Sequence, residues 1–76
     1  MKILIIEDEA KTGNYLKQGL SEASFVVDLV RNGTDGLHHG LTETYDLIIL
    51  DVMLPGIDGW AVLQGIRKAE IGRAHV

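Results

Sequence analysis

Three short runs of hydrophobic residues in this chain lack the alternation with polar residues that marks a half-buried strand. Ile3–Ile6 and Leu47–Leu50 are continuously apolar and rich in β-branched residues, and the segment 25–30 is a third largely apolar run. Strands that are covered on both faces in a parallel sheet have this pattern. The first run ends abruptly at Glu7 and the last ends at Asp51. We therefore predict three strands, of which the two continuously apolar ones have the pattern of strands covered on both faces and end on a carboxylate.

Between and after these runs, hydrophobic residues recur with the period of an α-helix. Residues 10–23 predict a helix whose inward face is made by the following set: Thr12, Leu16, Leu20 and Ala23. Residues 34–42 predict a short helix with Leu37 and Leu41 inward. Residues 59–69 predict a third helix, capped by Asp58. Its expected core face comprises Val62, Leu63 and Ile66.

The predicted elements alternate between strand and helix, and their connections are short. Such alternation gives an α/β fold with a parallel sheet, right-handed crossovers and helices on both faces. In a doubly wound sheet of strand order 2-1-3, the first and third strands are neighbours. Their carboxyl ends flank the point where the winding direction reverses, which is where ligands bind in such sheets. This topology brings Glu7, Asp8 and Asp51 into one crevice, although they are distant in the sequence.

Composition limits the possible functions. The chain has 76 residues, a formal net charge of −4 and no cysteine. A chain of this length makes one small domain at most, of marginal stability. Its acidic balance disfavours direct contact with nucleic acid, because phosphate contacts require a basic surface. Without disulfides, a signal peptide or a hydrophobic run long enough to span a membrane, we expect a soluble protein in the cytoplasm.

Three carboxylates in one crevice repel each other strongly. At about 4 Å and an effective dielectric constant near 20, each pair costs on the order of 4 kcal/mol. A bound divalent cation that prefers oxygen ligands would relieve this repulsion. Mg²⁺ fits best where phosphate chemistry follows, because it retains water and phosphate oxygens among its ligands. An aspartate in such a site can act as a nucleophile and form an acyl phosphate.

Specific motifs now point to a family. The Glu7-Asp8 pair, the strand 46–51, and the sequence Met53-Leu54-Pro55-Gly56 followed by Asp58-Gly59 resemble the front half of bacterial two-component receiver domains. The finer resemblance, carried by residues 11–13 and 58–60, is to OmpR/PhoB-type response regulators of heavy-metal (copper or silver) resistance. It implies a truncated flavodoxin-like, CheY-like fold from which strands 4 and 5 are missing.

The resemblance also implies a role for each matching residue. Asp51 is expected to accept the phosphoryl group, and Asp8 to bind Mg²⁺ directly. Glu7 is expected to assist through water, and Met53 to offer its backbone carbonyl to the metal. Ser24 departs from the family, which commonly has glycine at this position. If the position requires a positive φ, serine there is strained.

The implied partners and boundaries extend beyond this chain. A sensor histidine kinase would supply the phosphoryl group, and transcription would be controlled through a C-terminal winged-helix DNA-binding domain that is absent here. The full-length protein would dimerise on phosphorylation, and any link to copper would run through the sensor. We assign residues 1–70 to a partial receiver domain. Residues 71–76 are expected to be a non-native tail, translated from sequencing-adapter DNA. The fragment alone is expected to fold poorly and to be inactive.

Two alternatives use the same residues differently. A phosphatase of the haloacid-dehalogenase type also has a nucleophilic aspartate after a strand, but it requires a second aspartate where this chain has Met53. A receiver-like interaction module without phosphorylation is the other alternative, although the acidic residues are intact. If the chain is a receiver domain, as the resemblance implies, we expect no enzyme activity. His38 and His39 are expected to be exposed, because adjacent helical residues diverge by about 100° and cannot easily share a tetrahedral metal site.

Overall fold

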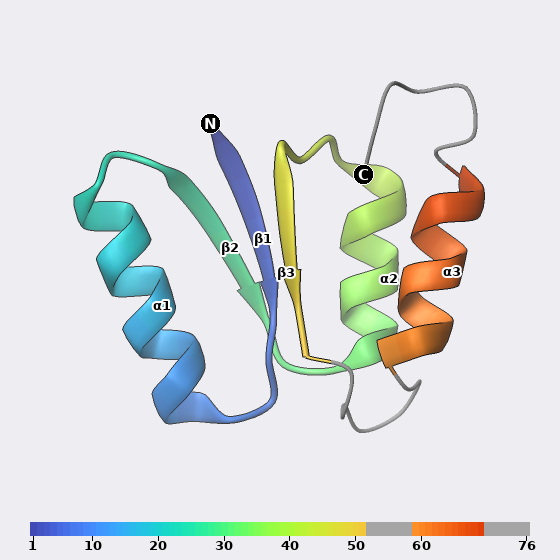
Figure 1. The fold of residues 1–76 in the computed structure, drawn as a ribbon, viewed down its shortest axis with the longest axis horizontal. Helices are drawn as coiled ribbons and strands as arrows, with labels where there is room; N and C mark the ends of the chain where they lie inside the picture. The colour runs from blue at the N-terminus through green and yellow to red at the C-terminus, as the bar shows by residue number, and fades with distance from the viewer. Residues whose placement is uncertain (52–58, 70–76) are drawn as a thin grey trace.

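A computed structural model describes residues 1–51 and 59–69, and in this part of the chain strands and helices alternate (Figure 1). The elements are β1 (Lys2–Ile6), α1 (Ala10–Glu22), β2 (Val26–Val30), α2 (Gly33–Thr42), β3 (Leu47–Leu50) and α3 (Gly59–Ala69). All the predicted elements are present, and no end differs from its predicted position by more than one residue.

The strands form a parallel sheet of order β2-β1-β3, as predicted. Leu4 of the central strand is paired with Asp28 of β2 on one side and with Ile48 of β3 on the other. All four hydrophobic residues of Ile3–Ile6 are at most 1% exposed. The unbroken apolar run therefore belongs to a strand that is covered on both faces.

Helices cover opposite faces of this sheet (Figure 1). A Cβ atom at Gly13 of α1 would lie 3.0 Å from Leu29 of β2, and one at Gly36 of α2 would lie 2.7 Å from Ile6 of β1. Leu29 is paired with Ile5, the neighbour of Ile6, and successive residues of a strand point to opposite faces. It follows that α1 lies on one face and α2 on the other.

The main hydrophobic core lies between the sheet and the helices α2 and α3. Its buried members are Leu4, Ile6, Tyr45, Val62 and Ile66. Partly buried residues packed around them are Val30, Leu37, Ile48 and Leu50. The predicted core face of α3 is thus confirmed for Val62 and Ile66, whereas Leu63 is half-buried.

The predicted inward faces of the first two helices were partly wrong. Leu41 is 45% exposed, because α2 turns its glycine face to the core and buries Gly36 and Gly40. In α1, Thr12 and Ala23 are exposed, Leu16 and Leu20 are half-buried, and the buried residue is Gly13. In both helices a glycine lets the backbone approach the sheet, and hydrophobicity alone does not reveal such a contact.

Ser24 has a φ of 73°, as anticipated if this position requires a positive value. It follows the C-cap of α1, where the left-handed conformation usually belongs to glycine.

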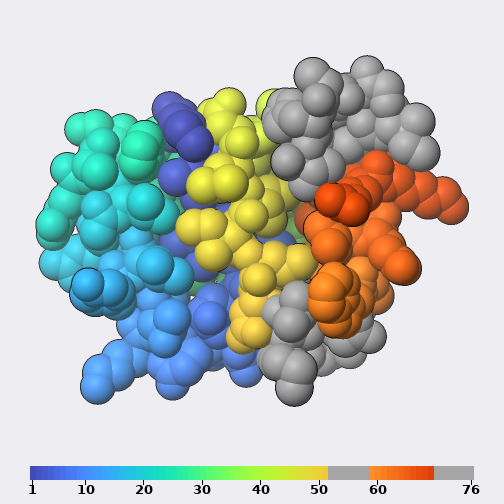
Figure 2. Space-filling model, in the orientation of Figure 1, coloured from blue at the N-terminus to red at the C-terminus, as the bar shows by residue number. Residues whose placement is uncertain are grey.

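At one edge of the sheet, β3 has a neighbour on one side only among the described strands, and Leu47 is 44% exposed. Figure 2 shows the yellow atoms of β3 at the surface, between those of α1 and α3. Among the described residues, no helix is both long and apolar enough to cross a membrane.

Candidate functional site

The ends of β1 and β3 place Glu7 and Asp51 through backbone hydrogen bonds. The N–H of Asp51 donates to the carbonyl oxygen of Ile6 at 3.0 Å, and the N–H of Glu7 donates to that of Val30 at 3.0 Å. These bonds extend the ladder of a sheet in which Ile6 is paired with Leu50. The backbone therefore fixes both acidic residues at the carboxyl ends of adjacent strands.

The structure brings together all three carboxylates that the sequence analysis expected in one crevice. Oxygen atoms of Glu7, Asp8 and Asp51 lie within 4.8 Å of one another. Glu7 and Asp51 are half-buried, and Asp8 is exposed. Two adjacent residues after β1 and one after β3 thus form a compact acidic site that solvent can reach.

The charges in this site affect the protonation of Glu7. The backbone N–H of Glu9 donates to Glu7 Oε2 at 3.1 Å and lowers the pKa of Glu7. Burial, the Asp51 carboxylate and Asp8 act in the opposite direction, and the net effect is a raised pKa. Like charges at short range disfavour ionisation in this way. A cation in the site would remove that cost.

Glu9 has a different role from its two acidic neighbours. It is the N-cap of α1, and its Oε1 accepts hydrogen bonds from the N–H groups of Lys11 and Thr12 at 2.8 and 3.1 Å. These bonds satisfy free donors of the first turn. Glu9 therefore holds the helix start while Glu7 and Asp8 remain available to a ligand.

The donor set fits Mg²⁺. Mg²⁺ binds oxygen at 2.0–2.1 Å in an octahedral shell, so two ligands on opposite sides lie about 4.1 Å apart. The carboxylate oxygens of Asp8 and Asp51 are within 4.8 Å of each other, a separation that small side-chain rotations can close.

Three predictions from the sequence fall outside the described residues. They are the Met53 carbonyl as a metal ligand, Asp58 as a helix cap, and the domain boundary at residue 70 with the tail of residues 71–76.

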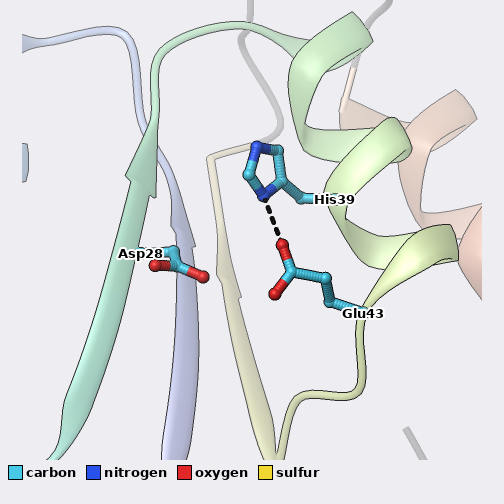
Figure 3. A group of neighbouring side chains, drawn as sticks. All are labelled: Asp28, His39 and Glu43. Carbon is cyan, nitrogen blue, oxygen red and sulfur yellow. Dashed lines mark ion pairs between the residues drawn. The ribbon is translucent and has the colours of Figure 1, made fainter.

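Sequence reasoning missed a second polar group, on the α2 side of the sheet (Figure 3). His39 is half-buried rather than exposed, with its Nδ1 3.3 Å from both Glu43 Oε2 and the Tyr45 hydroxyl. The Tyr45 hydroxyl in turn donates to Asp28 Oδ2 at 2.6 Å. The i, i+4 spacing of His39 and Glu43 was visible in the sequence. His38 is exposed, as expected.

Comparison with known proteins decides the family. Residues 3–75 match the family model described as the response regulator receiver domain. The chain belongs to this family. Receiver domains of transcriptional regulators are generally not enzymes.

Among curated proteins, this receiver domain is similar to transcriptional regulators. It is 64% identical over 69 residues to the transcriptional activator protein IrlR of Burkholderia pseudomallei, which covers 91% of the chain and 30% of that protein. It is 57% identical over 72 residues to the transcriptional regulatory protein CusR of Escherichia coli, and the match covers 95% of this chain and 32% of CusR. It is 54% identical over 72 residues to the probable transcriptional regulatory protein SilR of Salmonella typhimurium, and the match covers 95% of this chain and 32% of SilR. These relatives confirm the predicted resemblance to OmpR-type regulators, and the chain spans about a third of their length.

Solved receiver structures have the same fold. The response regulator TrrA of Thermotoga maritima, in complex with Mg²⁺-BeF, superposes with a TM-score of 0.86 at 37% identity, over 92% of this chain and 61% of that one. The receiver domain PA1611REC of Pseudomonas aeruginosa has a magnesium ion coordinated in its active site cleft. It superposes with a TM-score of 0.88 at 30% identity, over 95% of this chain and 59% of that one. The truncated flavodoxin-like, CheY-like fold is thereby confirmed.

Proposed function

We propose that this receiver domain accepts a phosphoryl group on Asp51 from a sensor histidine kinase. The observation that carries the proposal is the convergence of the Glu7, Asp8 and Asp51 carboxylates within 4.8 Å at the carboxyl ends of two adjacent strands. Support for the kinase as partner comes from TrrA, which has also been solved in complex with the histidine kinase ThkA.

Each residue has a defined part in the transfer. An oxygen of Asp51 attacks phosphorus, an aspartyl phosphate forms, and the bond from phosphorus to the donor's nitrogen breaks as that nitrogen takes up a proton. Asp8 and Asp51 would hold Mg²⁺ directly and Glu7 through water, and the Met53 carbonyl would be a further ligand, as the resemblance to receiver domains implies. When bound at these residues, Mg²⁺ would supply charge neutralisation for the incoming phosphoryl oxygens. The protein is a switch and not a phosphatase with turnover.

The output lies outside this chain. We propose that the complete protein works in the cytoplasm and regulates transcription through a C-terminal winged-helix domain, dimerising on phosphorylation. Relatives such as CusR, which are regulators about three times as long as the matched region, support this proposal. By the complete protein we mean the product of the full open reading frame that encodes residues 1–70 at the source locus. Resequencing that locus also tests whether the codons for residues 71–76 belong to it.

We further propose that the 76-residue chain alone is not productively phosphorylated. Among the described strands β3 is at the edge of the sheet, with Leu47 44% exposed, and exposed hydrophobic edges promote aggregation. The resemblance to receiver domains implies that a lysine and a hydroxyl residue, which contact the phosphoryl group, would lie in strands 4 and 5, beyond this chain. Measurable acyl-phosphate formation by a stably folded 76-residue chain would contradict this proposal.

An acyl-phosphate assay on the complete protein tests the main proposal. The protein is incubated with Mg²⁺ and a small phosphodonor such as acetyl phosphate, and the bound phosphate is measured. We expect stable labelling of wild type, loss of labelling in Asp51→Asn, and loss when Mg²⁺ is chelated. Continuous substrate turnover would indicate a phosphatase, and no labelling of wild type would indicate an interaction module.

Asp46 provides a matched control. It precedes the other end of β3, where its Oδ2 accepts a hydrogen bond from the N–H of Lys2 at 2.7 Å. Asp46→Asn makes the same chemical change as Asp51→Asn and keeps an oxygen that can accept this bond. Labelling should survive in Asp46→Asn. Equal loss in both variants would show that the effect of Asp51→Asn is not specific to the site.

A further inference from the structure

We propose that Asp28, His39 and Glu43 form a second metal site, which takes a divalent transition-metal ion of the zinc type. Each of the three side chains offers one donor atom, and these atoms lie within 4.8 Å of one another. In Figure 3 the Asp28 carboxylate extends from β2 toward His39 and Glu43 of the α2 segment. The inference is independent of the proposed phosphorylation of Asp51.

The distances suit zinc. Zn²⁺ binds imidazole nitrogen and carboxylate oxygen at about 2.0–2.2 Å in a tetrahedron, so neighbouring ligand atoms are about 3.3 Å apart. His39 Nδ1 and Glu43 Oε2 are 3.3 Å apart. Their i, i+4 spacing puts both side chains on the same helix face, as in helical zinc-binding motifs. Asp28 supplies the third ligand from the sheet, which leaves the fourth position to water.

The donor types separate this site from the one at Asp51. The three carboxylates near Asp51 offer oxygen only, which favours Mg²⁺, whereas an imidazole ligand favours zinc and similar transition metals. Asp28 is paired with Leu4, three residues before Glu7. At a rise of about 3.3 Å per residue, the cluster at Asp28 is therefore roughly 10 Å from the acidic site at Glu7, measured along β1.

The surroundings favour a cation here. Glu43 is the C-cap of α2, and His39 lies in its last turn. The carboxyl end of a helix carries partial negative charge and stabilises bound cations. Two carboxylates face one ammonium group, that of Lys2, so the cluster stays negative while the imidazole is neutral. The side chains of His39 and Glu43 are 33% and 39% exposed, which leaves a path for an ion.

The hydrogen bonds of the two carboxylates are compatible with a bound ion, whereas an ion on His39 Nδ1 would replace that atom's contact with the Tyr45 hydroxyl. Lys2 Nζ donates to Glu43 Oε1 and so leaves Oε2 facing His39. The Tyr45 hydroxyl donates to Asp28 Oδ2, and the carboxylate has a second oxygen, Oδ1. Metal-binding carboxylates are commonly held by such outer hydrogen bonds, which orient them toward the ion. Lys2 and Tyr45 act as positioning residues in this arrangement.

Zinc titration of the complete protein tests the site. The titration is run in excess Mg²⁺, to occupy the Asp51 site, and against a chromogenic zinc chelator. We expect His39→Gln and Glu43→Gln to weaken the binding of one zinc ion by about tenfold or more. His38→Gln is the matched control, because His38 is adjacent and exposed and does not belong to the cluster, although its ring lies edge-on to that of His39 with centroids 6.1 Å apart. This variant should bind zinc like wild type.

Two further measurements make the result decisive. Mg²⁺ affinity and Asp51 labelling should be unchanged in His39→Gln and Glu43→Gln, which separates failure of this site from failure of the phosphorylation site. In wild-type crystals grown with zinc, anomalous scattering should place the ion among Asp28, His39 and Glu43. Equal zinc affinity in His39→Gln and wild type, or zinc found only elsewhere, would show that the cluster is a hydrogen-bond network and overturn the proposal.

Discussion

The N–H of Asp51 donates a hydrogen bond of 3.0 Å to the carbonyl oxygen of Ile6. This bond belongs to the backbone, so it holds Asp51 beside the end of β1 whatever its side chain is. Substitutions of the carboxylates can therefore change the chemistry of the site without moving the strands that carry it. The side chains of Glu7 and Asp8 complete an acidic group that the sheet has already positioned.

Asp8 should dominate Mg²⁺ binding. Asp8→Asn removes a charged oxygen ligand, and we expect the Mg²⁺ affinity of the complete protein to fall by roughly tenfold or more, measured by titration calorimetry. Glu9→Gln is the control, since the Glu9 carboxylate caps α1 through the N–H groups of Lys11 and Thr12. It should leave Mg²⁺ affinity nearly unchanged. Similar losses in both variants would mean that general negative charge, and not ligation, attracts the ion.

Gly36 permits the close packing of α2 on the sheet. A Cβ atom there would lie 2.7 Å from Cδ1 and 2.8 Å from Cγ2 of Ile6, whose side chain is fully buried. We expect Gly36→Ala to lower the free energy of unfolding of the complete protein by about 1–3 kcal/mol in urea denaturation. Gly19→Ala, which meets nothing within 4 Å in α1, should instead raise it by about 0.5–1 kcal/mol. An unchanged stability of Gly36→Ala would show that α2 lies farther from β1.

The strands and the main site could be predicted from the sequence because each depends on a simple rule. Apolar runs without alternation identify the strands of a parallel sheet, and the switch-point rule then places Glu7 beside Asp51. The inward face of α2 could not be predicted in this way. It is formed by glycines such as Gly36 and Gly40, which have no side chain to show a hydrophobic pattern.

The second polar group was unpredictable for another reason. Its members come from β2, from α2 and from Tyr45 in the segment before β3, and only the folded chain brings them together. The sequence shows the i, i+4 relation of His39 and Glu43, but it gives no sign that Asp28 faces the same side of the sheet. The available signal was Asp28 itself, a carboxylate within an otherwise apolar strand, because such a group requires a partner where it is buried.

Ser24 stores strain in the turn after α1. Its φ of 73° is unfavourable for any residue with a Cβ atom, and glycine removes that cost while adding freedom to the unfolded chain. We expect Ser24→Gly to raise the free energy of unfolding by about 0.5–1 kcal/mol. Ser21→Gly, the same substitution inside α1, should lower it by about 0.5 kcal/mol. If both variants lose stability in thermal unfolding, Ser24 does not have a positive φ in solution.

Tyr45 links the core to Asp28. Its side chain is buried, and its hydroxyl donates to Asp28 Oδ2 at 2.6 Å. Tyr45→Phe leaves that carboxylate without this donor, and we expect the free energy of unfolding to fall by about 1–2 kcal/mol in zinc-free buffer. Tyr15→Phe makes the same change at a residue that is 77% exposed, and it should have almost no effect. Equal effects of the two substitutions would argue against the buried hydrogen bond.

The contribution of Tyr45 should depend on pH. Burial, followed by the hydrogen bond to Asp28, raises the pKa of Tyr45 well above its ordinary value of 10.0. The folded state therefore holds the phenolic proton more tightly than the unfolded state does, and this stabilisation is complete below pH 10. As the pH rises above 10, the unfolded state loses the proton first and the advantage over Tyr45→Phe decreases. Denaturation curves of both proteins at a series of pH values measure this difference. A stability difference that grows above pH 10 would mean that Tyr45 ionises more easily in the fold than in the unfolded chain.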